Sequence, residues 1–149
     1  MVEYKVNTAS AGQIAAFLQE CDGDFALALS RKVNIAEYGA KLKDKAENFE
    51  AWDGDKLIGL VSAYMNDFAT KQAFLSMVCV APAFRGKGIG RWLMHDFINA
   101  AAEKGFYESK LEVDKNNVYA IALYKALGYV MTAGEGGKDF MVRKGRKNA

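Results

Sequence analysis

A short segment of the chain, residues 85–91 with the sequence RGKGIGR, interleaves three glycines with three cations and contains no acidic residue. Glycine has no Cβ, so the backbone there can approach a ligand closely, and cations without neighbouring acids attract a negative group. An apolar strand precedes the segment, and an amphipathic helix begins near Ile89. A helix N-terminus exposes N–H groups that carry a partial positive charge. The pattern therefore predicts a phosphate-binding loop, and the alternative is a flexible surface turn.

The spacing of these glycines does not fit the two commonest nucleotide-binding loops. A P-loop needs glycine in place of Ala81 and serine or threonine in place of Gly88. The dinucleotide fingerprint needs glycine in place of Arg91. Glu112 does lie about 20 residues further on, where that fingerprint has a ribose-binding acid. A nucleotide-binding oxidoreductase therefore stays as a weakened alternative.

A second motif, residues 111–129 with the sequence LEVDKNNVYAIALYKALGY, combines a strand with the helix that follows it. The R-G-x-G-I-G loop after a V-x-P strand end, together with this second motif, resembles the GNAT family of acetyl-CoA-dependent N-acetyltransferases. The L-E-V…N-x-x-A-I-x-L-Y spacing is similar to that of the ribosomal-protein N-terminal acetyltransferases within the family. From the start of the first motif to the end of the second, residues 80–129 span about a third of the chain.

The resemblance implies an α/β fold with a mixed, mostly antiparallel central sheet of about seven strands, a splayed parallel central pair and flanking helices, in one domain over residues 1–149. Acetyl-CoA would be the acetyl donor, without a metal, and its pantetheine would lie where strands 74–80 and 107–113 separate. An amide near Met77 or Val78 would polarise the thioester carbonyl. The cofactor-binding residues that the resemblance implies are Met77, Val78, Val80, Arg85, Gly86, Lys87, Gly88, Ile89, Gly90, Arg91, Asn117 and Tyr124.

Two side chains of the second motif suit the chemistry of acetyl transfer. The family commonly places a tyrosine at the position of Tyr124, so we expect Tyr124 to protonate the departing thiolate; a packing role is its alternative. Glu112 alternates with Leu111 and Val113 and therefore points to the opposite face of its strand. The resemblance makes Glu112 the expected catalytic base, acting through water, with solvation or an ion pair as the alternative. Asn117 would either reach the cofactor or serve as a helix N-cap.

The expected reaction is direct acetyl transfer to a primary amine of an unidentified acceptor, with a small molecule favoured over a protein N-terminus. The acidic segment 20–24 could attract a cationic amine, although solvated acids at a helix end are the first interpretation. The alternative function is a non-catalytic acyl-CoA-binding or sensing module, against which Glu112 and Tyr124 argue. Cys79 is interpreted as a core thiol and His95 as a surface or core residue.

The elements that must position these residues follow from hydrophobic periodicity and capping patterns. Strands are predicted over residues 2–6, 49–53, 56–65, 73–80, 107–113, from 128 onward and over 140–142. Helices are predicted after Thr8 or Ser10, over 24–47 with a break near Asn34, from 89 to about 105, and over 117–127. The apolar strand that ends at Val80 should be central and buried on both faces. Antiparallel strands come first, and crossovers that need parallel pairing follow.

Composition and charge narrow the remaining classes. The 149 residues are 51% hydrophobic and 26% charged, which suits one globular domain, and a net charge of +2 is too small to indicate nucleic-acid binding. No apolar run approaches membrane-spanning length, and Cys21 and Cys79 form no metal-binding pattern. We therefore expect a cytoplasmic protein without nucleic-acid or membrane partners, either a monomer or a weak homodimer through a sheet edge.

Overall fold

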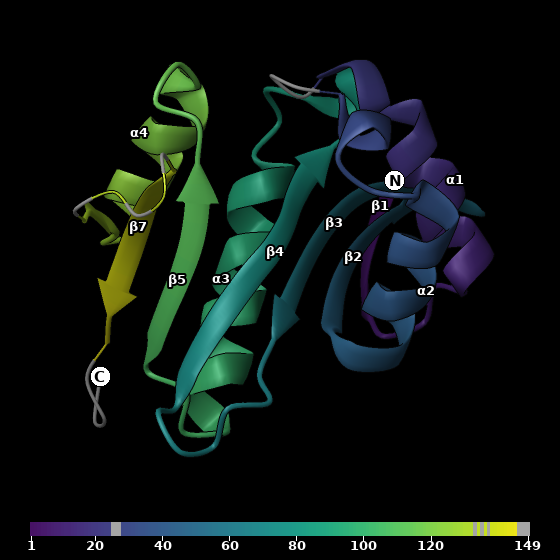
Figure 1. The fold of residues 1–149 in the computed structure, drawn as a ribbon. Coiled ribbons are helices and arrows are strands. Elements are labelled where there is room, and N and C mark those ends of the chain that lie inside the picture. The colour runs from purple at the N-terminus through teal and green to yellow at the C-terminus, as the bar shows by residue number, and fades with distance from the viewer. Residues whose placement is uncertain (25–27, 133, 135, 137, 146–149) are drawn as a thin grey trace. The chain divides into compact units, whose positions relative to one another are not determined.

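The strands form one mixed sheet, and helices lie beside it (Figure 1). The computed structural model describes residues 1–24, 28–132, 134, 136 and 138–145. In chain order the strands and α-helices are β1 (Val2–Val6), α1 (Ala11–Glu20), α2 (Ile35–Lys45), β2 (Glu47–Asp53), β3 (Lys56–Tyr64), β4 (Gln72–Val80), α3 (Ile89–Glu103), β5 (Glu108–Val113), α4 (Val118–Ala126), β6 (Val130–Met131) and β7 (Asp139–Lys144).

Within the described residues, seven strands are hydrogen-bonded in the order β1-β2-β3-β4-β5-β7-β6. The pairs β1–β2, β2–β3, β5–β7 and β6–β7 are antiparallel, and β4–β5 is parallel. The predicted fold class, a mixed and mostly antiparallel sheet with a parallel pair, is therefore confirmed. The parallel register runs from Gln72↔Glu108 to Leu75↔Leu111, although β4 continues to Val80 and β5 to Val113. The parallel ladder thus covers only the first part of each strand.

The chain divides into two compact units. The first comprises Met1–Ala63 and Met77–Phe97, and the second comprises Tyr64–Ser76 and Ile98–Ala149. Strand β4 and helix α3 are therefore each divided between the two units.

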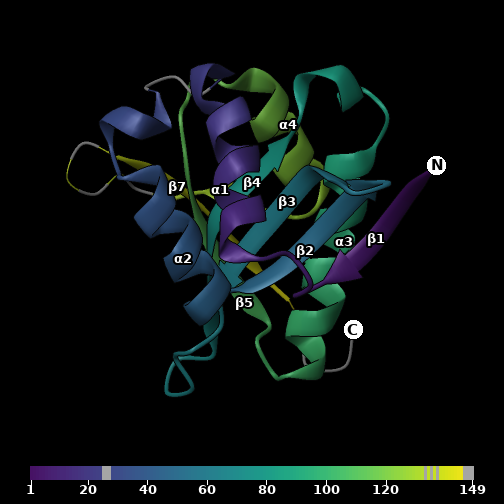
Figure 2. The same ribbon diagram turned by 90° about the vertical axis from the view of Figure 1, so that its right-hand side faces the viewer.

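In the first unit, helices cover both faces of β2 and β3 (Figure 2). A Cβ added at Gly59 of β3 would lie 3.2 Å from side-chain atoms of Ile89 and Leu93, so the first turns of α3 pack directly on this strand. On the opposite face, Ser62 Oγ donates to Asn48 Oδ1 at 2.6 Å, and the Asn48 amide donates to a carbonyl of α2.

A buried carboxylate joins the start of α1 to β2. The side chain of Glu50 has 0% exposure. Its Oε1 accepts from Thr8 Oγ1 at 2.6 Å and Trp52 Nε1 at 3.0 Å, and its Oε2 accepts from the N–H groups of Thr8 at 3.0 Å and Ala9 at 2.9 Å. All of these groups are neutral donors, which suit the acceptor-only carboxylate.

The helix predicted over residues 24–47 is only partly correct. Short 3-10 turns, Asp22–Asp24 and Leu29–Arg31, precede α2, and residues 25–27 lie outside the described residues. Asp22 accepts hydrogen bonds from the N–H and the Oγ of Ser30, both at 2.7 Å, and such local side-chain bonds compete with helix formation. The predicted break is confirmed, because Asn34 is the N-cap of α2.

In the second unit, one face of β5 is buried and the other faces outward. Ser109, Leu111 and Val113 are buried, whereas Glu112 is exposed. β4 is central, but the expectation that both of its faces are buried is wrong, since burial alternates along it and Phe74 is 37% exposed. An apolar run alone does not reveal whether a second layer covers a strand.

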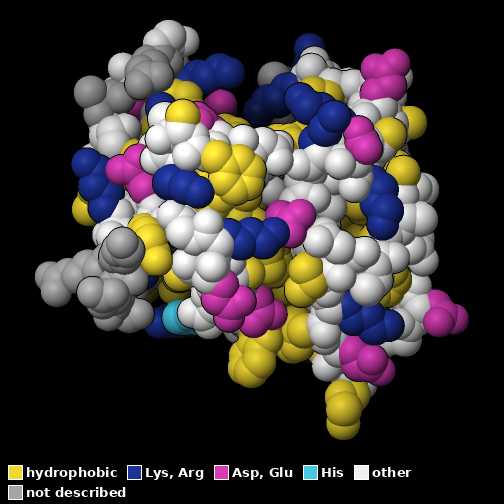
Figure 3. All heavy atoms as spheres, turned by 90° about the horizontal axis from the view of Figure 1, so that it is seen from below, with side chains coloured by type: hydrophobic (Ala, Val, Ile, Leu, Met, Phe, Trp, Pro, Cys, Tyr) yellow, Lys and Arg dark blue, Asp and Glu magenta, His cyan; other side chains and the backbone are white. Residues whose placement is uncertain are grey.

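The surface carries charges of both signs. Lys, Arg, Asp and Glu side chains are interspersed on the face seen from below in Figure 3, in keeping with the small net charge of +2. Among the described residues, every helix is too short or too polar to cross a lipid bilayer.

Candidate active site

The predicted phosphate-binding loop connects β4 to α3 in the first unit. A 3-10 turn, Pro82–Phe84, follows the strand, and Gly86 and Gly88 then adopt positive φ angles of 76° and 80°. Both glycines have open space where a Cβ would stand. The N–H of Trp92 donates to Gly88 O at 3.0 Å, so the N–H groups just before Trp92 belong to the first turn of α3 and have no partner within the helix. Such a turn suits phosphate oxygens.

Two loop cations make contacts within the loop. Arg85 Nε donates to Val80 O at 2.9 Å, and Lys87 Nζ lies 5.4 Å from the centre of the Phe84 ring. A pantetheine bound at the backbone of Val80 would share this carbonyl with Arg85. Arg91 is exposed in the first turn of α3. The backbone amides are therefore the principal phosphate donors that the geometry offers, and Arg91 adds charge beside them.

The expected catalytic base, Glu112, points away from the core as the alternation predicted. Its neighbours Leu111 and Val113 are 2% and 7% exposed, whereas 42% of the Glu112 side chain is exposed. Lys138 Nζ lies 3.5 Å from Glu112 Oε1. The ion pair that was the alternative to a catalytic role is therefore present, in an exposed form.

Two further predicted site residues belong to the α4 segment of the second unit. Asn117 is the N-cap, and its Oδ1 accepts from the N–H of Ala120 at 3.2 Å. This bond uses only the amide oxygen, so the Nδ2 group is still a donor. The side chain of Tyr124 is 7% exposed, and its ring centre lies 5.9 Å from that of Tyr129. The capping and packing contacts named as alternatives are thus both present.

Tyr129, next to Tyr124, is held as a neutral phenol. Burial raises the pKa of Tyr129 to about 12, against the smaller lowering effects of its hydrogen bond with Ser109 and of the Arg143 charge. Its hydroxyl lies 2.6 Å from Ser109 Oγ. The neutral side chain anchors the segment after α4 on β5.

The pH dependence of stability should report this burial. Below pH 10 the phenol is neutral in both the folded and the unfolded chain. Above pH 10 the Tyr129 phenol ionises first in the unfolded chain. The free energy of unfolding therefore falls by about 2–3 kcal/mol as the pH rises towards 12. Urea titrations between pH 9 and 12 should therefore show a smaller fall in unfolding free energy for Tyr129→Phe than for the unchanged chain. Tyr119→Phe, at an 88% exposed position, is the control, and equal falls in all three proteins would contradict the prediction.

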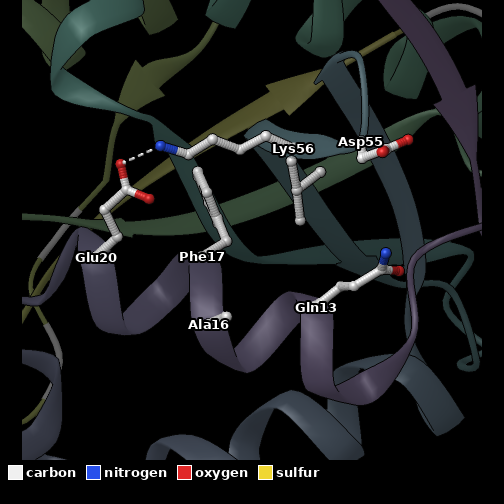
Figure 4. A pocket seen from close by; sticks show the side chains of 7 residues that line it. Gln13, Ala16, Phe17, Glu20, Asp55 and Lys56 are labelled. Atoms are coloured by element: carbon white, nitrogen blue, oxygen red, sulfur yellow. Dashed lines mark hydrogen bonds and ion pairs between the residues drawn. The ribbon is translucent and has the colours of Figure 1, made fainter.

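A pocket of about 170 Å³ lies between α1 and the β2–β3 hairpin (Figure 4). Lys56 Nζ pairs with Glu20 Oε1 at 3.2 Å beside it. Hydrogen bonds from Ser30 hold the pKa of Asp22 below its ordinary value. These two acids of segment 20–24 therefore have partners, which favours the helix-end interpretation. The predicted catalytic and cofactor-binding residues do not line this pocket, whose lining is Gln13, Ala16, Phe17, Glu20, Asp55, Lys56 and Leu57.

The remaining candidates for chemistry have ordinary environments. Cys79 is buried at 8% exposure, as expected of a core thiol, and His95 is exposed on α3. Within the described part of the chain, no group of three or more His, Cys, Asp or Glu side chains is arranged to hold a metal ion.

Lys138 contacts the expected base Glu112, a contact which the sequence did not reveal. It directly precedes β7, at even spacing with Phe140, Val142 and Lys144. This spacing places the four residues on one face, but the partner of that face depends on the register of β7 against β5. The even spacing could therefore have indicated that these residues share a face, but not that Glu112 is the partner of Lys138.

Residues 14–129 match the family model described as the acetyltransferase (GNAT) family. The match covers most of the chain, and the chain belongs to this family. Members of the family are acetyltransferases that use acetyl-CoA.

The chain is 34% identical over 83 residues to the N-alpha-acetyltransferase MAK3 of Arabidopsis thaliana. These residues are 55% of this chain and 44% of that protein. It is 38% identical over 58 residues to the ribosomal protein bS18-alanine N-acetyltransferase of Salmonella typhimurium, 39% of each chain. The matches therefore span less than half the length of either relative. The PaiA N-acetyltransferase of Thermoplasma acidophilum, solved with coenzyme A, has the same fold, with a TM-score of 0.74 at 18% identity over 95% of this chain and 99% of that one.

Proposed function

We propose that this chain transfers the acetyl group of acetyl-CoA directly to a primary amine. A small-molecule amine is the first acceptor candidate. The observation that carries the proposal is the loop before α3, where Gly86 and Gly88 have positive φ beside a helix N-terminus in a chain of the GNAT family. One relative is named an N-alpha-acetyltransferase and another a ribosomal protein bS18-alanine N-acetyltransferase, and these names support a peptide α-amine as the second candidate.

Strand β4 and the loop after it would hold the acetyl donor. Acetyl-CoA supplies the thioester, and amides of residues 85–91 would bind its pyrophosphate, with the Arg91 side chain adding charge. The residues present fit this role, because the loop combines backbone donors with open space beside Gly86 and Gly88. The backbone near Met77 and Val78 would bind pantetheine and donate to the thioester oxygen, where negative charge develops.

Two side chains, Glu112 and Tyr124, would move the protons. Glu112 would accept a proton from the acceptor ammonium, through water, which leaves a neutral and nucleophilic amine. The amine nitrogen then forms a bond to the acetyl carbon as the carbon–sulfur bond breaks. Tyr124 would donate a proton to the departing sulfur, so coenzyme A leaves as the free thiol. The proton that the attacking nitrogen loses on becoming an amide would pass through water and restore the Tyr124 hydroxyl. Asn117 would contact the donor through its Nδ2 group.

A panel of primary amines assayed with acetyl-CoA tests the proposal, with free thiol as the readout. The panel contains amino acids, polyamines, amino sugars and short peptides with free N-termini. Amine-dependent thiol release is the expected result. A non-catalytic acyl-CoA-binding module would bind acetyl-CoA in calorimetry and release no thiol with any amine, and this outcome would overturn the proposal.

Replacing Gly88 by alanine should weaken acetyl-CoA binding about tenfold. The φ of Gly88 is +80°, and a residue with a Cβ loses about 1–2 kcal/mol there, so the loop would relax away from the conformation that aims its amides. Because nothing stands within 4 Å of the added Cβ, the effect comes from backbone strain. Calorimetry with acetyl-CoA measures the change.

Gly54→Ala is the matched control for this strain. Gly54 lies in the β2–β3 hairpin with a φ of +59° and equally open space beside it. Both substitutions should lower the free energy of unfolding by similar amounts, and only Gly88→Ala should change the Kd of acetyl-CoA. Equal affinities in the two variants would remove the loop from the binding site.

A further inference from the structure

The outward face of β5 and β7 in the second unit carries a series of charged side chains. Glu108, Lys110 and Glu112 occupy alternate positions on β5 and share this face. β7 runs antiparallel beside β5 (Figure 1), with Phe140 opposite Glu112. Lys110 Nζ lies 4.5 Å from the centre of the Phe140 ring, and Lys144 Nζ lies 3.9 Å from Glu108 Oε1. Lys144 of β7 therefore reaches an acid of β5 across the strand pair.

Lys138, which directly precedes β7, reaches Glu112 diagonally, since Phe140 is the residue opposite Glu112. The Nζ–Oε1 distance is 3.5 Å, and the side chains are 62% and 42% exposed. An exposed ion pair of this kind contributes about 0–1 kcal/mol, so another ammonium group can displace Lys138 at little cost. The primary ammonium of the flexible Lys138 side chain thus already pairs with the Glu112 carboxylate, which an acceptor amine has to reach.

We propose that Lys138 selects the acceptor by an exchange of ion-pair partners: the acceptor amine replaces Lys138 at Glu112, and a carboxylate on the same acceptor pairs with Lys138. The inference rests on the proposed role of Glu112 as base and narrows the acceptor class. An amine without an acidic group would take the Glu112 carboxylate from Lys138 and leave Lys138 without an anionic partner. An amino acid, or a peptide with an acidic residue near its α-amine, restores the lost pair. The preferred acceptor is therefore a primary amine with a carboxylate close to it.

The test uses two peptide amides with a free α-amine, Ala-Glu-Ala and Ala-Gln-Ala, which differ by one carboxylate. Thiol release from acetyl-CoA gives KM and kcat for each. The unchanged chain should show a KM about three- to fivefold lower for the Glu peptide, since one exposed ion pair is at stake. In Lys138→Met the two KM values should converge, with that of the Gln peptide falling and that of the Glu peptide rising, while kcat stays within about twofold. Lys138→Arg should keep the preference.

Lys144→Met is the matched control, because it removes the same charge from the same face at the Glu108 pair. It should keep the preference for the Glu peptide. Equal preferences in Lys138→Met, Lys144→Met and the unchanged chain would overturn the role of Lys138 and leave the proposed function intact. If only a small amine of the panel is acetylated, its acid and amide forms replace the peptides. If no amine is acetylated, the proposed function fails and the exchange fails with it.

Discussion

Tyr124→Phe is expected to lower kcat by about 100-fold while the Kd of acetyl-CoA stays within about twofold. A positioned acid contributes about 10²–10⁴-fold to such a step, and the departing thiolate needs a proton. Phenylalanine keeps the ring that packs at 5.9 Å from Tyr129 in a site only 7% exposed. The substitution therefore removes the hydroxyl and preserves the packing. Thiol release at saturating acceptor gives kcat, and calorimetry gives the Kd.

Tyr119→Phe separates this effect from a general effect on α4. Tyr119 lies in the same helix and is 88% exposed, so the same chemical change there should alter neither kcat nor Tm. A thermal melt of Tyr124→Phe within a few degrees of the unchanged chain shows that the fold is kept. Full turnover in Tyr124→Phe would assign this residue to packing alone and leave the departing thiolate to be protonated by water.

The order of the elements could be predicted from the sequence because its determinants act over a few residues. Ser10 caps α1 through a reciprocal pair of hydrogen bonds with Gln13, at the spacing that the sequence shows. Gly54 turns the β2–β3 hairpin, and Gly105 follows the end of α3, both with positive φ. The glycine loop and the strand–helix motif likewise lie within short segments, so the family could be recognised from them.

The contacts of the site residues could not be predicted, since they depend on pairing between distant segments. Lys138 meets Glu112 only because of the register of β7 against β5, and a shift by one residue would turn it to the other face. Arg85 folds back to the carbonyl of Val80, a contact that depends on the turn between them rather than on residue type. The helix expected over the residues before Asn34 is wrong for a similar reason. The sequence does not show that Asp22 accepts a hydrogen bond from the N–H of Ser30.

Glu50→Gln is expected to lower the free energy of unfolding by about 3 kcal/mol. The carboxylate of Glu50 accepts from donors on both oxygens and is fully buried. An amide offers one acceptor oxygen and turns an NH₂ group towards the remaining donors. Buried donors without an acceptor cost about 1–3 kcal/mol each. Urea denaturation monitored by tryptophan fluorescence measures the loss, and Glu3→Gln, at an exposed position of β1, should change stability by less than about 0.5 kcal/mol.

A double variant shows whether the donors are the cause. Thr8→Val removes the 2.6 Å hydrogen bond to Glu50 Oε1 and should cost about 1 kcal/mol by itself. With that donor already gone, an amide at position 50 leaves fewer donors without acceptors. The loss in Thr8→Val/Glu50→Gln should therefore be smaller than the sum of the single losses by about 1 kcal/mol, as coupled neighbours require. Strict additivity would mean that the cost of Glu50→Gln arises elsewhere, and the carboxylate would not be what ties the start of α1 to β2.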